Sequence, residues 1–591
     1  MRRRFKTLAR AIQSKSSTPI IGDTIEITST DGSAAVWAFR GTVGQTIAQT
    51  PAQLVDALFN DGSGNQWALV PLSGLAKLEV PSSALGDVEG NEANLTLVLA
   101  AAVAALKVSG GGVLKLGGGT KTLEDRLSLP DNITVEGIGI DVTNIVLSTS
   151  FPIGKAAFIN DTISVGAYTY GNSNINFKKL TISGGGNTGR LTGLVDLLKT
   201  KDSGFEEVKF KDSDYFGITD AGNLNLLVRA CKFDNLGKST GASPAIWSQS
   251  YLADNTLSIG TKIVYSDFTN NNRSAIQAAS REMIIGRNTF SNNGESTIFM
   301  NTNALGCIIT NNIIKRANLT DISAHGIEVG GSGHIIAGNN ISDTDGTGIS
   351  TLDVTNSKIS NNTIENYRVD AVFYSATWSA SGIGVTNTVA GVTSNLTIND
   401  NTIIKGVNGV NAIVVFHAAL STPCEELSII DNNLTDGGSG DAIHYQSSLT
   451  EKLGINCTVR GNQGHISNSG AVLSFQAGTG VGDYTHSALG FPPHKLRFKA
   501  VRVVTNEQSN SDGVAMRGGQ GFTQYSALNS STGLVAGGTQ GSFTVIRIDD
   551  SNGTTLFRAT ISDFEGGDGL GFKITKSVAT INPLILLDAE P

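Results

Sequence analysis

The sequence predicts an all-β chain whose main part is a parallel β-helix, a solenoid in which each coil of short strands stacks on the next. A phrase of alternating apolar residues that ends in asparagine recurs through residues 283–462. Its spacing runs from 23 to 39 residues, within the range of about 20 to 50 that solenoid repeats occupy. Seventy glycines among 591 residues and only 6% aromatic residues also suit a turn-rich β protein.

The repeated phrase is typified by MIIGRNTF and LSIIDNNL, in which an apolar residue stands two positions after the asparagine. Alternating apolar residues point to one side of a strand. An asparagine at the same turn of each coil can bond the asparagine of the next coil through its amide, so we expect an asparagine ladder. Spacings above 30 residues indicate loops that leave the solenoid at a turn. The marker asparagines are Asn288, Asn312, Asn339, Asn362, Asn401, Asn432 and Asn462.

A weaker form of the phrase extends the repeat upstream. The segments EEVKF, RACKF and YSDF place Phe210, Phe233 and Phe268 where Phe290 lies in the first clear repeat. We therefore expect these rings to form a stacked column inside the solenoid. Cys231 then occupies the asparagine position of its coil.

Composition excludes several classes of function. A formal net charge of −8 argues against nucleic acid as a partner, and no run of 18 apolar residues predicts a membrane span. The basic N-terminus lacks the apolar core of a secretion signal. Seven scattered histidines and the absence of a calcium loop predict neither a metal site nor a cofactor. The cysteines show no CxxC spacing and are expected to be reduced and buried; they are Cys231, Cys307, Cys424 and Cys457.

Residues 1–85 predict a small adaptor region. The first residues are basic and carry Phe5, Leu8 and Ile12 at helical spacing, which fits either a docking peptide or a solvated tail. TIEITST and AVWAF then predict strands, and PAQLVDALFND predicts a helix with Pro51 in its first turn.

The β-helix is expected over residues 86–480 and a separate antiparallel β domain over 481–591. The alanine-rich stretch from Leu95 to Leu106 predicts a helix that covers the apolar floor of the first coil. After residue 480 the repeated phrase stops, and FTVIRID, TLFRATI and LGFKITK predict strands joined by Gly, Asn and Asp turns. That domain would serve trimerisation or glycan binding.

Two resemblances add to these predictions. ANLTLVLAAAVAALKVSGGGVLKLGGG and DRLSLPDNITVEGIG, within residues 86–147, resemble the start of pectate-lyase-like right-handed β-helix proteins, although the turn at Gly118–Thr122 matches loosely. The layout of basic N-terminus, capped β-helix and C-terminal β domain resembles a bacteriophage tailspike. This resemblance implies a homotrimer in the phage tail, docked through its N-terminus to other tail or baseplate proteins, whose β-helix binds and cleaves a bacterial surface polysaccharide at the host cell surface.

The second strand of each coil predicts a glycan-binding face. We align these strands by an apolar anchor, so that the next residue points outward, as Trp247 follows Ile246. Sugars stack on rings, and their hydroxyls bond amides and carboxylates. Coils about 4.8 Å apart would make a groove of about 30 to 40 Å; alternatively, another subunit covers this face. The predicted substrate-binding residues are Trp247, Gln277, Phe299, Asn301, Phe373 and His444.

Glycoside cleavage requires two carboxyl groups, one of them protonated. Glu328 is the predicted general acid, because its place between Phe299 and Phe373 in the aligned column would desolvate its carboxyl. Asp370 or Glu295 is the predicted base or nucleophile.

A rival carboxyl pair, Asp321 and Asp343, falls where other coils have asparagines (Asn270, Asn292 and Asn366), which favours a structural turn ladder. Two other functions remain open, and a third is disfavoured. His325, spaced His-x-x-Glu from Glu328, would serve as the base of a lyase on an acidic glycan. The chain would otherwise be a non-catalytic receptor-binding spike. A secreted bacterial pectate-lyase-like enzyme is disfavoured by the missing signal peptide.

Overall fold

The computed structural model describes the chain from 95 to 463, except for residues 109, 165, 186–191, 239–242, 318–324, 368–380, 389–390, 407–410, 418–423, 436–441 and 448–456. Outside that range it describes only the strands named below. The chain forms two compact units, which we call unit one (Met1–Ala324) and unit two (His325–Pro591) and describe separately.

Unit one begins with a five-stranded sheet in the order β1, β2, β3, β5, β4. β2 and β3 confirm the two strands predicted from the sequence. The helix expected over 51–61 is wrong at Leu58–Asn60, and the helical spacing near the N-terminus is wrong at Arg2–Phe5, because both segments pair with neighbouring strands. The strands are β1 (Arg2–Phe5), β2 (Thr24–Thr28), β3 (Ala34–Thr42), β4 (Leu58–Asn60) and β5 (Asn65–Val70).

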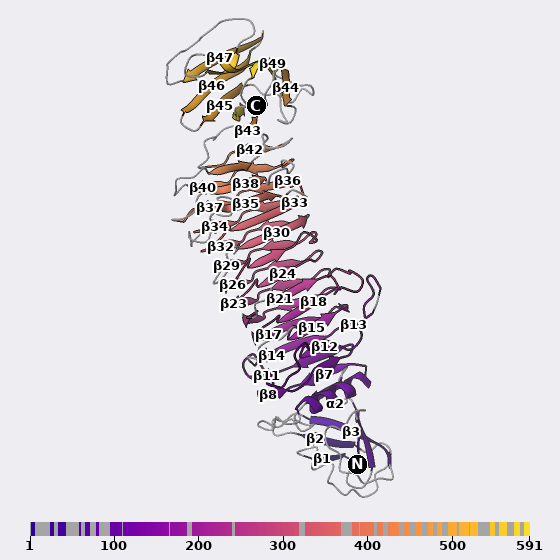
Figure 1. Ribbon diagram of the computed structural model, residues 1–591. Helices are drawn as coiled ribbons and strands as arrows, with labels where there is room; N and C mark the ends of the chain where they lie inside the picture. Colours follow the sequence, from indigo (N-terminus) through magenta and orange to yellow (C-terminus); the bar gives the residue numbers. More distant parts are fainter. Residues whose placement is uncertain are drawn as a thin grey trace. The chain divides into compact units, whose positions relative to one another are not determined.

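The predicted capping helix is α2 (Leu95–Val108), which packs on β7, β8 and β9 of the first coil (Figure 1). Leu99, Ala102 and Leu106 are fully buried at helical spacing and form its apolar face. The helix ends at glycines with positive φ; a Cβ on Gly111 would lie 2.5 Å from Asn132, so this turn requires glycine. Strand β6 (Leu78–Pro81) pairs parallel with β7 beside the cap.

Each coil of unit one contributes three short strands, and each strand pairs in parallel with its counterpart in the next coil. Three parallel sheets result, which we call the first, second and third sheets. The first contains β7 (Gly112–Lys115), β10 (Ile133–Glu136), the starts of β14 (Asn176–Ser183) and β17 (Gly204–Ser213), β19 (Leu227–Arg229), β22 (Lys262–Val264), β25 (Ile284–Gly286) and β28 (Ile308–Thr310).

The other two sheets of unit one follow the same rule. The second contains β8 (Gly119–Leu123), β11 (Thr143–Leu147), the ends of β14 and β17, β20 (Lys232–Leu236), β23 (Asp267–Thr269), β26 (Thr289–Asn293) and β29 (Ile313–Ala317). The third contains β9 (Leu127–Leu129), β12 (Phe158–Asn160), β15 (Val195–Leu198), β18 (Ile218–Ala221), β21 (Ile246–Gln249), β24 (Ile276–Ala278) and β27 (Ile298–Met300).

Unit two repeats this coil pattern. Its first-sheet strands are β31 (Ile335–Ala337), the end of β33 (Ile349–Ser360), β36 (Ser394–Asn399), β39 (Ser428–Ile430) and β42 (Thr458–Arg460). Its second-sheet strands are β32 (Asn340–Ser342), β34 (Thr363–Glu365), β37 (Thr402–Ile404) and β40 (Asn433–Thr435). Its third-sheet strands are β30 (Ile327–Ser332), the start of β33, β35 (Ser381–Asn387), β38 (Asn411–His417) and β41 (Ile443–Ser447).

The predicted phenylalanine column lies inside unit one. The ring centroids of Phe210 and Phe233 are 5.1 Å apart, those of Phe233 and Phe268 are 4.5 Å apart, and those of Phe268 and Phe290 are 4.8 Å apart, all stacked. These four side chains are fully buried. The rings therefore repeat at the spacing of the coils, as the strand register requires.

The asparagine ladder is present in both units. In unit one the Asn288 side-chain amide donates to Asn312 Oδ1 (3.0 Å), and the Cys231 backbone N–H bonds Ser266 in the same column. In unit two the amides of Asn339, Asn362, Asn401 and Asn432 each donate to the next marker Oδ1 over 2.8 to 2.9 Å, ending at Asn462. All four cysteines are free and buried, as predicted.

Antiparallel pairing replaces the parallel coils at the C-terminal end of unit two. β43 pairs antiparallel with β42 and β51, so the parallel pairing of the coils ends at β42. One group of strands contains β43 (Ala471–Gln476), β45 (Lys495–Val504), β46 (Glu507–Gly518), β47 (Gly521–Asn529) and β51 (Leu584–Glu590). A four-stranded sheet contains β44 (Gly482–His486), β48 (Thr544–Asp549), β49 (Thr555–Asp563) and β50 (Phe572–Ala579).

Candidate functional site

The outward side chains of the third sheet form a row in unit one. Trp247, Gln277 and Phe299 are paired in register on β21, β24 and β27, as the anchor alignment predicts. They face outward because the isoleucine before each of them is fully buried, and all three are partly exposed. We call these three residues the outer row. Asn301, two residues beyond Phe299, is also partly exposed, and its Oδ1 accepts the Asn303 backbone N–H.

An aromatic cluster supports one end of the outer row. The Trp247 ring centroid lies 4.6 Å from that of Phe216, which in turn lies 4.6 Å from that of Tyr215. Phe216 is buried and fixes the indole from one side. This aromatic pair was not predicted, because it precedes β18 in a turn, outside the strand alignment; the consecutive aromatics of DYFG were the available signal.

Glu295 lies in the turn before β27, with a positive φ of 49°. Its carboxylate forms an ion pair with Arg273, which lies in the corresponding turn before β24, and both side chains are about one-quarter exposed. Arg273 was not predicted, because a turn arginine 22 residues upstream carries no local sign of its partner. The pair therefore lies near the N-terminal ends of β24 and β27, two of the strands that carry the outer row.

Glu328 lies on β30 of unit two, partly exposed and in register with Ser350. The prediction that Phe373 follows Ser350 in this column is wrong. Ile349 pairs with Ile383, so Gly384 takes that place. Phe373 and Asp370 belong to residues 368–380, outside the described part of the chain.

His325 lies next to Glu328 but is only 6% exposed. Its Nδ1 accepts the Thr347 backbone N–H at 3.2 Å. Burial lowers the pKa of His325, while the Glu328 charge acts in the opposite direction. Because Nδ1 accepts this hydrogen bond, the proton of the neutral imidazole lies on Nε2.

The last two column residues of unit two differ in exposure. Val414 follows the buried anchor Ile413 and pairs with Gly384, and it is buried as well. His444, a predicted substrate-binding residue, pairs with Val414 and is partly exposed.

Asp343, one of the two rival carboxylates, belongs to a turn ladder. The Asn366 amide donates to Asp343 Oδ1 at 2.6 Å, and the Asn292 amide donates to Asn270 Oδ1 at 3.3 Å. All four residues have positive φ, which favours Asn and Asp. The structural interpretation of this column is confirmed there; Asp321 lies outside the described residues.

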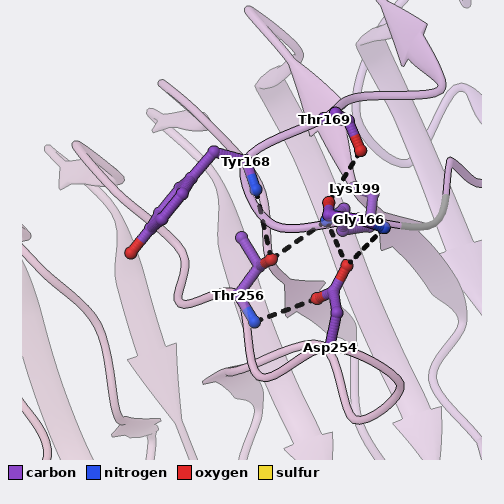
Figure 2. A network of polar contacts seen from close by, with 6 residues as sticks. All are labelled: Gly166, Tyr168, Thr169, Lys199, Asp254 and Thr256. Atoms are coloured by element: carbon purple, nitrogen blue, oxygen red, sulfur yellow. Dashed lines mark hydrogen bonds and ion pairs between the residues drawn. The ribbon is translucent and has the colours of Figure 1, made fainter.

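A buried lysine network joins the end of β15 to the segment that follows β21 in unit one (Figure 2). Lys199 is fully buried, and its Nζ donates to Asp254 Oδ2 (2.7 Å), the Gly166 carbonyl (2.7 Å) and Thr256 Oγ1 (3.0 Å). The hydrogen bond from Lys199 holds the pKa of the Asp254 carboxyl well below its usual range. This network was not predicted, because Lys199 and Asp254 are 55 residues apart.

A second buried charge also went unpredicted. Asp220 points inward from β18 and is fully buried. Its carboxylate accepts hydrogen bonds from Ser248, Ser258, Thr261 and Asn223 at 2.6 to 2.8 Å. Burial raises the pKa of Asp220, and these donors act in the opposite direction. Because both carboxylate oxygens are bonded inside the solenoid, Asp220 serves the fold.

Neither a metal centre nor a membrane span emerges from the described residues. Within them, no three or more His, Cys, Asp or Glu side chains gather in a way that suits a metal ion. No helix in that part of the chain has the length and apolar character to cross a bilayer.

Comparison with known proteins agrees with the geometry of the coils. A family model described as "Right handed beta helix region" matches residues 251–474. The solenoid is therefore a right-handed parallel β-helix, as the resemblance implied. No curated protein matches the sequence.

Three solved structures illustrate the range of similar chains. The tailspike gp61 of Pseudomonas phage phi297 has 9% identity and a TM-score of 0.46, over 84% of this chain and 92% of that one. The surface adhesin PfbA of Streptococcus pneumoniae has 12% identity and a TM-score of 0.44, over 77% and 99%. The mannuronan C-5 epimerase AlgE4 A-module of Azotobacter vinelandii has 16% identity and a TM-score of 0.38, over 64% and 99%. Likeness this distant carries no argument about function.

Proposed function

We propose that this chain is a bacteriophage tailspike that binds and cleaves a bacterial surface polysaccharide. The observation that carries the proposal is the outer row, in which two aromatic rings and an amide project side by side from a rigid sheet. The resemblance of the chain's layout to tailspikes, with its capped β-helix and C-terminal β strands, supports the same function.

The outer row has the chemistry that saccharides require. The C–H faces of sugar rings stack on aromatic rings, while sugar hydroxyls bond side-chain amides. Three strands about 4.8 Å apart present a surface about 10 Å long, which matches roughly two sugar residues. Phe216 restrains Trp247 before any ligand binds, so less conformational entropy is lost on binding.

Binding is tested with host surface polysaccharide immobilised on a biosensor. Trp247→Ala is expected to weaken binding by about tenfold or more, as truncation of an aromatic anchor does. Tyr265→Ala is the control, since Tyr265 is 52% exposed and lies between the first and second sheets. Equal affinities for wild type and Trp247→Ala would exclude the outer row as the binding face.

For cleavage, we propose hydrolysis by paired carboxyl groups. Glu328 remains the proposed general acid in unit two, with Asp370 as its base or nucleophile. Glu295 in unit one is a separate candidate for a base or nucleophile, because its ion pair with Arg273 fits a carboxylate better than a proton donor. A lyase is the second candidate, with His325 as its base. The burial of His325 and the bond at its Nδ1 favour the hydrolase.

The products distinguish these chemistries. Hydrolysis in heavy-oxygen water places one labelled oxygen at the new reducing end, whereas elimination gives unsaturated, unlabelled fragments. Loss of cleavage in Glu328→Gln, with glycan binding retained, would support its role as the acid. Intact cleavage in both Glu328→Gln and Asp370→Asn would exclude that site, and binding without any fragments would make the protein a receptor-binding spike.

We further propose that the chain is a homotrimer that docks to other tail or baseplate proteins through residues 1–85. Light scattering coupled to size exclusion is expected to give three times the monomer mass of 61.5 kDa. A monomer at micromolar concentration would contradict this part of the proposal.

A further inference from the structure

Two loops that follow strands of the third sheet of unit one meet through hydrogen bonds. One runs from 161 to 171 after β12, and the other from 250 to 257 after β21, the strand that carries Trp247. The described residues 166–169 and 251–256 of these loops contact one another, and we call them the tyrosine platform. Gln249 at the end of β21 and Tyr251 on the platform are only two residues apart. The platform therefore borders the proposed glycan-binding face.

Lys199 joins the two loops. An ammonium group has three donors, and all three are used here, for Gly166, Asp254 and Thr256. Asp254 Oδ2 also accepts the Gly166 backbone N–H at 3.1 Å, and Thr256 Oγ1 accepts the Tyr168 backbone N–H at 3.4 Å. The loops are thus held by side-chain and backbone bonds together (Figure 2).

The network holds an aromatic side chain in an unfavourable position. Tyr168 has a φ of 56°, a conformation that bulky residues rarely adopt, yet its side chain is 50% exposed and fills no core. Figure 2 shows its ring directed away from the network, with the hydroxyl at the far end. Burial of the Lys199 charge costs desolvation free energy, and the exposed Tyr168 ring adds no packing to offset that cost. We therefore look for a role of the ring outside the protein core.

The exposed surface of the platform is uncharged. Three residues are exposed on one loop, namely Ala167, Tyr168 and Thr169. On the other loop Leu252 is 78% exposed. The only charged platform residue, Asp254, has its carboxylate bonded to Lys199. A ring and an aliphatic side chain flanked by hydroxyls match the apolar face and hydroxyl edge of a pyranose, whereas a charged partner finds no counter-charge.

We infer that the tyrosine platform is a second carbohydrate-binding site, which stacks a further sugar of the same polysaccharide against Tyr168 beyond the outer row. This inference rests on the proposed function, because it takes the ligand from it. Lys199 acts as a positioning residue: it orders the platform and does not contact the sugar. Longer fragments therefore reach both sites, and short ones fill the outer row alone.

The test measures affinity against fragment length with the full chain. Size-fractionated oligosaccharides, prepared by partial acid hydrolysis of the host polysaccharide, are titrated calorimetrically. Tyr168→Asn removes the ring but keeps a residue that tolerates positive φ. Long fragments are expected to bind this variant about tenfold more weakly, and short fragments as tightly as wild type. Tyr265→Asn removes an equally exposed tyrosine with positive φ at another place and is the control.

The positioning role of Lys199 has its own readout. Lys199→Met keeps most of the side-chain volume and removes the three hydrogen bonds. We expect faster amide exchange at Gly166 and Tyr168 together with the same loss of long-fragment affinity. Unchanged exchange and unchanged affinity would overturn the role assigned to Lys199, while Tyr168→Asn tests the site whether or not this variant folds.

The outcomes separate the two proposals. If wild type binds no fragment of any length, both the proposed function and the inference about the tyrosine platform are contradicted. If Trp247→Ala weakens binding but Tyr168→Asn binds all lengths as wild type does, only the platform inference is overturned. If Tyr168→Asn instead lowers the solution mass without changing affinity, the platform contacts a second copy of the chain, which also overturns it.

Discussion

Replacement of Asn432 by alanine tests the contribution of the asparagine ladder. Asn432 is fully buried, and its side-chain amide donates to the carbonyls of Ile398 and Ile430 and to Asn462 Oδ1 at 2.8 to 3.1 Å. Its Oδ1 accepts both the backbone N–H and the side-chain amide of Asn401. One side chain therefore satisfies donors and acceptors from three successive coils.

The expected cost follows from the groups left behind. The backbone N–H of Asn401 is buried and loses its acceptor, which costs about 1 to 3 kcal/mol. The amide of Asn401 keeps the carbonyls of Ile359 and Asn399, so its loss is smaller. With the hydrogen bonds of the deleted amide included, we expect Asn432→Ala to lower the free energy of unfolding of unit two by about 3 kcal/mol.

The neighbouring Asn433 provides a matched control. It is exposed on β40, so Asn433→Ala is expected to change the free energy of unfolding by no more than about 0.5 kcal/mol. Urea unfolding followed by circular dichroism compares the two variants, and amide exchange at Asn401 reports the local loss. Equal effects for the two variants, or unchanged exchange at Asn401, would refute the argument from hydrogen bonding.

Other parts of the solenoid give further predictions. Phe268→Ala removes a stacked ring from the core of unit one and is expected to cost about 3 to 5 kcal/mol in urea unfolding. Gly222→Ala is expected to loosen the tyrosine platform, seen as faster amide exchange there, because Gly222 has a φ of 67° and a Cβ would lie 2.9 Å from Tyr251. Burial lowers the pKa of His334, so its neutral form stabilises unit two above about pH 6.5, and this stability is lost as pH falls through the folded pKa. His334→Gln should flatten the dependence of urea unfolding on pH below about 6.5.

Periodic features of the fold were predictable because every coil repeats them. The inward isoleucines of the third sheet recur at one position, so aligning the strands by these anchors was enough to place Trp247, Gln277 and Phe299 in register. The phenylalanine column was predictable for the same reason. A single short apolar segment does not distinguish a strand from a helix, but the same pattern in many successive coils does.

The alignment failed where a coil is long enough to contain two apolar anchors. Val372, which precedes Phe373, and Ile383 both follow Ile349 in sequence segments with an apolar anchor. The strand register shows that Ile383 is the residue that pairs with Ile349. Strand pairing likewise overrode a helical pattern at Leu58–Asn60. The network around Lys199 was beyond sequence reasoning, because its partners come from loops whose lengths follow no period.

The ladder of unit two joins coils of very different length. Asn339 and Asn362 are 23 residues apart and Asn362 and Asn401 are 39 apart, yet both pairs are linked by hydrogen bonds of 2.9 Å. Position along the stack is therefore set by pairing rather than by the number of intervening residues. Loops of 23-residue and 39-residue coils are thus accommodated without a change in the bonds between the coils, so loop length and sequence can diverge while the stacked strands keep their register.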